Sequence, residues 1–257
     1  MKALKFLVVC FFTCCLSGCF EMNEEFTVQE NGSGTLAVNM DMGQMMDMMK
    51  AFIPPEELEK AGEARDTTIH MKDLIDTATD LTAENKALLR DGTLRMQMNM
   101  QEKIFKVNML YPFKSMDNLQ KLYTSLGSGS TGMSGLLKGM QGSSPIMGGG
   151  AQPDMKSLSS YFDLVTKKNS ITRTLNKQKY EALLTDSMMQ QAKQMSTMMG
   201  GASGDIKMNT VIKLPAPAKK ITGAKAELST DKKTVLLRNN LLDIFEHPEV
   251  FEFSVEY

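Results

Sequence analysis

Short stretches in which apolar and polar residues alternate are the feature of this 257-residue chain that most limits its fold. Such stretches flank an Asn-Gly-Ser-Gly turn at 31–34, over 26–29 before it and 35–42 after it. A period of two around an Asn-Gly turn predicts a β-hairpin with one buried face. The alternation over 94–101 and 105–111 predicts a second hairpin, so antiparallel sheet is expected.

Segments with apolar residues at helical spacing lie between these two hairpins and after them in the sequence. One covers 45–52, where Asp41 can cap the helix, and another covers 82–89. Ser115 is a candidate cap for a further helix that continues to Leu122, and a long amphipathic helix is expected over 180–199. The expected fold class is therefore α+β, with antiparallel hairpins and amphipathic, Met-rich helices packed on one face of the sheet.

The same order of elements is expected on both sides of a Gly/Ser/Met-rich segment at 127–157, which is typical of a flexible linker. The sequence is thus divided into an N-terminal α+β half at 19–126 and a C-terminal α+β half at 158–257, which could be duplicated. The elements expected in the second half are a hairpin over 161–166 and 171–175, a strand over 206–214, a hairpin over 224–229 and 234–238, a short helix over 241–245 and a closing strand over 251–257.

The start of the chain has the parts of a secretory signal. Lys2 and Lys5 precede an apolar run over 6–16, which is shorter than the ~20 residues that a membrane-spanning helix needs. The run ends in Leu16-Ser17-Gly18-Cys19, which resembles the lipobox of bacterial lipoproteins. The resemblance implies that residues 1–18 are removed as a signal peptide and that Cys19 carries diacylglyceryl and an N-acyl chain such as palmitate.

The resemblance also bears on localisation. Phe20 follows Cys19, where Asp would favour retention in the inner membrane of Gram-negative bacteria. The resemblance therefore implies an exported protein that is lipid-anchored in the cell envelope, with the outer membrane favoured.

The cysteines and the charge balance exclude several kinds of site. The four cysteines are Cys10, Cys14, Cys15 and Cys19, and the first three leave with the signal peptide. No disulfide, thiol nucleophile or Cys-based metal site can then form within the mature chain. Lys2 and Lys5 also leave, so 27 basic residues remain against 30 acidic ones, and this balance does not favour nucleic acid as a partner.

Methionine is abundant, with 24 residues, and three interpretations of it are open. The first is that methionine fills irregular core space, because the methionines follow the apolar periodicity. The second is a Cu(I) site, because thioethers select that ion. The third is an adaptable groove for a lipid, acyl chain or peptide. Core filling is favoured, with no metal and no cofactor expected, and the residues of the copper alternative are Met45, Met48, Met49, Met96, Met98 and Met100.

No motif for catalysis is present in the sequence. The two histidines, His70 and His247, lie far apart, and neither stands in a metal-binding or nucleophile motif. The adjacent acids Glu24 and Glu25 are expected on a solvated face, and adjacency in sequence does not make a general acid/base pair. No catalytic residues are therefore proposed, and the protein is expected not to be an enzyme.

Two further segments resemble LppM-type envelope lipoproteins. One is 25–42 with its turn at 31–34, and the other is Leu214-Pro215-Ala216-Pro217 together with the turn over 230–235. That family often places Trp after this turn, whereas this chain has no tryptophan. The resemblance implies a poorly defined function. The favoured hypothesis is a non-enzymatic binding or structural module that is held at the membrane by lipid on Cys19. Its partner is an unknown protein or hydrophobic ligand. The alternatives are a Cu(I)-binding protein and a lipid- or peptide-binding protein.

Overall fold

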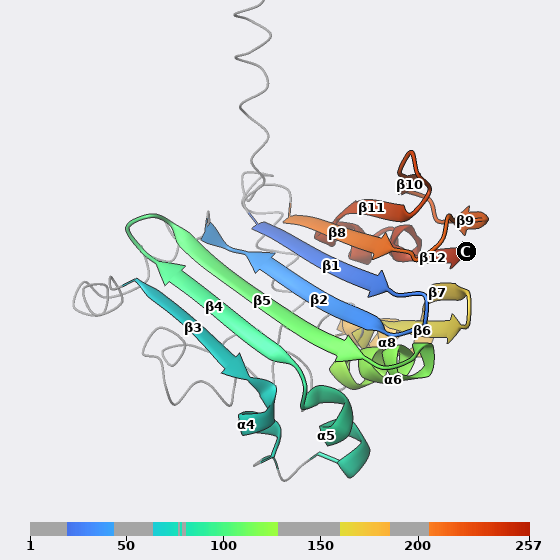
Figure 1. The fold of residues 1–257 in the computed structure, drawn as a ribbon. Coiled ribbons are helices and arrows are strands. Elements are labelled where there is room, and N and C mark those ends of the chain that lie inside the picture. The colour runs from blue at the N-terminus through green and yellow to red at the C-terminus, as the bar shows by residue number, and fades with distance from the viewer. Residues whose placement is uncertain (1–19, 44–63, 77, 79–80, 128–159, 186–205) are drawn as a thin grey trace, which may run out of the picture.

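The computed structural model describes residues 20–43, 64–76, 78, 81–127, 160–185 and 206–257, which form two β-sheets and several helices (Figure 1). The larger sheet, sheet A, has eight strands in the order β10-β11-β8-β1-β2-β5-β4-β3. Its strands are β1 (Phe20–Val28), β2 (Gly34–Asp41), β3 (Arg65–His70), β4 (Thr93–Asn99), β5 (Ile104–Phe113), β8 (Ile206–Lys213), β10 (Ala226–Leu228) and β11 (Thr234–Asn240).

Sheet A combines strands from both ends of the chain. Its neighbouring strands are antiparallel except for β1 and β8, which pair in parallel with Phe20 opposite Ile206 and Thr27 opposite Lys213. The N-terminal strand β1 therefore lies near the centre of the sheet, between β2 and β8, and β8 begins 186 residues after it. The expected halves 19–126 and 158–257 share one sheet, and their proposed duplication stays a prediction.

The smaller sheet, sheet B, has the strand order β6-β7-β12-β9. Its strands are β6 (Phe162–Lys167), β7 (Ser170–Leu175), β9 (Lys220–Thr222) and β12 (Phe253–Glu256), and neighbouring strands are antiparallel. The hairpin of β6 and β7 is the one that the alternation predicted. The closing strand β12 pairs with β7 on one side and with β9 on the other, so sheet B joins three separate parts of the chain.

Some of the helices begin where a polar side chain binds an early backbone N–H group. The Thr82 side chain accepts a hydrogen bond from the Asn85 amide at the start of α5 (Ala83–Leu89), and Ser115 accepts one from the Asn118 amide at the start of α6 (Met116–Gly127). The other helices are α4 (Met71–Ile75), α8 (Lys177–Thr185) and the 3-10 helices η4 (Leu241–Phe245) and η5 (Pro248–Phe251).

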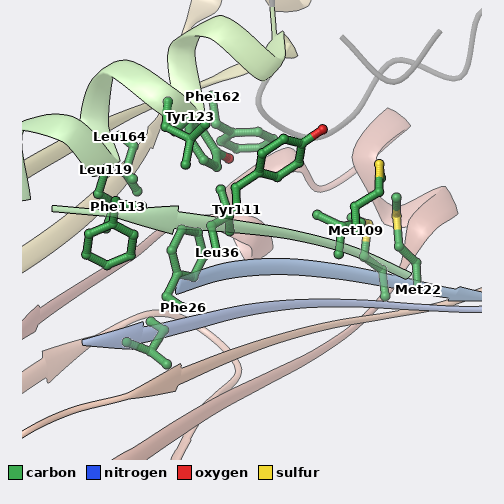
Figure 2. Close-up of a cluster of buried hydrophobic side chains, with 14 of the residues drawn as sticks. Met22, Phe26, Leu36, Met109, Tyr111, Phe113, Leu119, Tyr123, Phe162 and Leu164 are labelled. Atoms are coloured by element: carbon green, nitrogen blue, oxygen red, sulfur yellow. The ribbon is translucent and has the colours of Figure 1, made fainter. Parts of the chain in front are cut away.

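The hydrophobic core lies between one face of sheet A and a layer made of α6 and sheet B. Figure 2 shows Phe26 and Leu36 of sheet A facing Leu119 and Tyr123 of α6, with Phe162 of β6 beside them. All five side chains are at most 1% exposed. Burying a Leu or Phe side chain fully contributes about 1.5–3 kcal/mol, so this contact holds the two layers together.

Several methionines are part of the same core. Met22, Met40, Met98, Met109 and Met208 are each at most 8% exposed, and all five lie on the inner face of sheet A. For these residues the interpretation of methionine as core filling agrees with the structure. Thioether side chains adapt to irregular gaps, which suits an interface between a twisted sheet and a mixed layer.

The α+β class with antiparallel sheet is confirmed. The expected helix over 45–52 and most of the one over 180–199 lie outside the described residues, while its start at 180–185 is helical and belongs to α8, which begins three residues earlier at Lys177. The structure adds α4, β9 and η5, which the sequence patterns did not predict. Among the described helices, none combines the length and the apolar character needed to cross a membrane.

Candidate functional site

One face of sheet A points away from the core, and no described helix covers it (Figure 1). Its side chains are half-buried or exposed, and we call it the open face. It follows from the alternation, because successive residues of a strand point to opposite faces of the sheet. In β1 the inner residues are buried, whereas Glu21, Asn23, Glu25 and Thr27 are half-buried. The open face extends across all eight strands of sheet A.

Four asparagines form a row across the middle of the open face. Asn23 of β1 lies opposite Asn209 of β8 on one side and opposite Asn39 of β2 on the other, and Asn39 lies opposite Asn108 of β5. Neighbouring strands are about 4.8 Å apart, so the amides repeat at that spacing. We call these four residues the asparagine row.

Two arginines flank the asparagine row in the same register. Arg238 of β11 lies opposite Asn209, and Arg95 of β4 lies opposite Asn108. The row with its flanking residues therefore crosses six adjacent strands of sheet A. Only polar side chains stand in this line, and each amide can both donate and accept hydrogen bonds.

Hydrogen bonds order one half of the asparagine row. The Asn209 amide donates to Asn23 Oδ1 at 2.9 Å and to Glu21 Oε1 at 3.1 Å, and the Asn23 amide also donates to Glu21 Oε1, at 3.2 Å. The side chains of Asn39 and Asn108 have no hydrogen-bond partner among the described residues, and both are half-buried. Their amides are therefore available to a ligand or to water.

The charges on the open face balance one another. Its acids are Glu21, Glu25, Asp41, Asp66 and Glu227, and its bases are Arg95, Lys106, Lys207, Lys213 and Arg238. Four ion pairs form between them, which are Glu25–Lys213 at 2.7 Å, Asp41–Lys106 at 3.4 Å, Asp66–Arg95 at 2.6 Å and Glu227–Arg238. The open face is therefore polar but has no net charge.

A small apolar area adjoins the asparagine row. Leu110 of β5 is 42% exposed, and it lies opposite Ala37 of β2. Each is two residues along its strand from an asparagine of the row, Asn108 and Asn39 respectively, so the apolar pair and the amide pair are neighbours on one face. On β2 and β5, side-chain amides that can form hydrogen bonds therefore lie next to an exposed apolar side chain.

A second polar arrangement is buried between the two sheets. Arg173 of β7 is fully buried, and its guanidinium forms an ion pair with the carboxylate of Glu24 on β1, which is 6% exposed. The guanidinium also donates to Thr210 Oγ1 at 3.0 Å and to the Phe251 carbonyl at 2.9 Å. Its Cζ lies 4.7 Å from the ring centroid of Phe253, a cation–π contact.

The pKa values of this pair are set by burial and by mutual attraction. Burial raises the pKa of the Glu24 carboxyl, and Arg173 opposes this shift only in part. Burial by itself would lower the pKa of Arg173, but the adjacent Glu24 carboxylate raises it above its ordinary value. The guanidinium therefore keeps its charge, and the pair fixes β1 of sheet A against β7 of sheet B.

The structure corrects the expectation for Glu24. Adjacent Glu25 is half-buried on the open face as expected, whereas Glu24 points into the core, because it shares the inner register positions with Met22 and Phe26. An acidic residue at an inner position of a strand indicates that a basic residue is buried beside it. The complementary signal is Arg173, which stands at an inner position of β7, two residues after the buried Ile171.

Of the remaining candidate residues, the structure describes three methionines and the two histidines. Met98 and Met100 are 5% and 3% exposed in the core, and Met96 packs against it, while Met45, Met48 and Met49 lie outside the described residues. Copper binding by these methionines is therefore still a hypothesis. His70 and His247 are both exposed, at the end of β3 and just before η5. Cys19 lies outside the described residues, next to the first residue of β1.

Sequence reasoning did not find the asparagine row, because its members lie on strands that only the three-dimensional pairing brings together. Asn39, Asn108 and Asn209 occupy outward positions in the predicted stretches at 35–42, 105–111 and 206–214, so their faces could be predicted, whereas Asn23 precedes the stretch at 26–29. The register between β1 and β8 could not be predicted, since 186 positions separate Phe20 from Ile206.

Comparison with known proteins gives little further information. No protein-family model matches the chain, and no curated protein is significantly similar to it. A similar solved structure is the folded domain of the LppM protein of Mycobacterium tuberculosis, determined by NMR. The similarity has a TM-score of 0.34 at 6% sequence identity, and it covers 93% of this chain and 91% of that one.

Proposed function

We propose that this protein is an envelope lipoprotein that is anchored through Cys19 and acts as a non-enzymatic binding or structural module. The observation that carries the proposal is the position of the lipobox relative to the fold. Cys19 immediately precedes Phe20, the first residue of β1, and β1 is a central strand of sheet A. The acyl chains would thus be attached to the folded sheet without an intervening linker.

With this attachment, one edge of sheet A would face the lipid. The edge where β1 begins also contains the start of β8, the end of β2 and the turn between β4 and β5 (Figure 1). One residue spans at most about 3.6 Å, so this edge would lie at the lipid headgroups. The strands then run away from the membrane, and the open face would be accessible from the side.

The envelope location is part of the proposal. Several acyl chains on one residue are enough for stable anchoring, because each buried methylene contributes about 0.8 kcal/mol. Phe20 at the position after the cysteine, in place of Asp, supports the outer membrane rather than the inner one. A non-enzymatic role is supported by the exposed, separated positions of His70 and His247.

The experiment is an intact-mass measurement on protein purified from bacterial membranes, with a Cys19→Ala variant beside it. We expect a mass equal to residues 19–257 plus acyl chains. The variant should lose both the added mass and the membrane association. Cys15→Ala is the matched control, because it also removes a cysteine near the cleavage site but should leave acylation unchanged. An unacylated, membrane-free wild-type protein would contradict the proposal.

A further inference from the structure

We propose that the open face of sheet A binds an uncharged glycan chain, which lies across the strands along the asparagine row, Asn209, Asn23, Asn39 and Asn108. The proposal gives a ligand class to the binding module proposed above and rests on that function for its location in the envelope. The binding itself depends only on the open face, so it can be tested separately from the anchor.

The chemistry of the row fits hydroxyl groups. An asparagine amide presents a carbonyl acceptor and an N–H donor side by side, and a sugar hydroxyl can also both donate and accept. Asn39 and Asn108 are in the adjoining strands β2 and β5, in direct register, with no partner among the described residues. Two neighbouring amides can therefore bind hydroxyl groups of one chain.

The hydrogen bonds of Asn209 and Asn23, the other half of the asparagine row, also support glycan binding. Asn209, Asn23 and Glu21 bind one another, which holds these side chains in position before any ligand arrives. Ordered polar groups lose less conformational entropy on binding than mobile ones do. The row thus has an ordered part at β8 and β1 and an open part at β2 and β5.

The spacing and the apolar neighbours point to a chain of sugar rings. The amides repeat across the strands at about 4.8 Å, which is close to the repeat of one ring in an extended glycan. Sugar rings also have an apolar face made of C–H groups. Ala37 and the exposed Leu110 lie beside the open part of the row and can contact that face.

The balanced charge favours an uncharged ligand. Ion pairs join four of the five acids of the open face to four of its five bases, so an anionic or cationic polymer would find no excess of opposite charge there. Charged polymers are recognised mainly through such an excess. The open face is therefore not expected to favour a nucleic acid or a polyanionic glycan.

The test is calorimetric titration of the full lipoprotein, extracted in a detergent without a sugar headgroup. The probes are the neutral hexasaccharides chitohexaose, cellohexaose and maltohexaose, with hexagalacturonate as the charged counterpart. We expect binding to at least one neutral probe and none to hexagalacturonate. The double variant Asn39→Ala/Asn108→Ala removes two amides and should weaken that binding on the order of tenfold to thirtyfold.

Asn118→Ala is the matched control, because Asn118 is equally half-buried but lies on α6, on the other side of sheet A. It should leave the affinity unchanged, and circular dichroism should show all variants folded. Binding to none of the neutral probes, preference for hexagalacturonate, or equal binding by the double variant would each overturn the proposal. Because the titration uses no membrane, a failure of the anchor in the mass experiment would leave this result intact.

Discussion

Replacing Arg173 by Met should destabilise the protein far more than replacing Arg173 and Glu24 together. Arg173→Met leaves the Glu24 carboxylate buried without its partner, and breaking a buried ion pair in this way costs about 3–5 kcal/mol. The same substitution removes the hydrogen bonds to Thr210 and to the Phe251 carbonyl, which adds about 1 kcal/mol for each. The expected total is about 5–7 kcal/mol, a large part of the stability of a typical domain.

The double variant Glu24→Leu/Arg173→Met removes both charges and leaves only the two lost hydrogen bonds, which is a cost of about 2 kcal/mol. It should therefore be more stable than Arg173→Met by about 3 kcal/mol or more. The difference in stability is measured by urea unfolding, with each variant made in the Cys19→Ala protein. Far-ultraviolet circular dichroism is the signal, because the chain has no tryptophan whose fluorescence could be used. A difference of 3 kcal/mol moves the urea midpoint by about 1 M or more.

Arg95→Met is the matched control for this experiment. Arg95 pairs with Asp66 at 2.6 Å, but both side chains are about half exposed and screened by solvent, so its loss should leave the urea midpoint nearly unchanged. Two results would refute the reasoning. One is a double variant as unstable as Arg173→Met, and the other is an Arg173→Met variant as stable as Arg95→Met.

Three further predictions concern single residues of sheet A. Gly34→Ala should destabilise the fold by about 1–3 kcal/mol, seen as a lower urea midpoint, because an added Cβ would lie 1.9 Å from the Thr27 carbonyl oxygen. Tyr111→Phe should leave stability unchanged or slightly higher in the same assay, since the buried hydroxyl has no partner among the described residues; a loss above about 1 kcal/mol would show that the hydroxyl is bound. The hydrogen bond from Arg95 lowers the pKa of Asp66, so Arg95→Gln should raise that pKa toward its ordinary value in an NMR titration, and an unchanged value would contradict the assigned cause.

The local structure was largely predictable from the sequence because it depends on short-range patterns. The alternation over 26–29 and 35–42 predicted the hairpin of β1 and β2, and the structure places its turn at the expected Asn-Gly. Helices follow Thr82 and Ser115 because the side chains of these two residues accept hydrogen bonds from backbone N–H groups in the first turn. These features need only the neighbouring residues to form.

The long-range arrangement was not predictable in the same way. The parallel pairing of β1 with β8 and the addition of β12 to β7 depend on which strand edges meet, and no local pattern specifies that. Glu24 is the instructive residue. Its inner position continues the register of Phe26 and Val28 toward the start of β1, but its burial becomes tolerable only with Arg173, which is 149 positions away.

The parallel pairing of β1 with β8 also has a consequence for how the chain is synthesised. β1 is made first, yet its neighbour on one side begins only at Ile206. Until then the edge of β1 presents unpaired backbone groups to any other strand, which is the usual starting point of aggregation. Contacts this distant in sequence also slow folding. Chains truncated before β8 should therefore accumulate as aggregates, and the complete chain should depend on protection of this edge during its biogenesis.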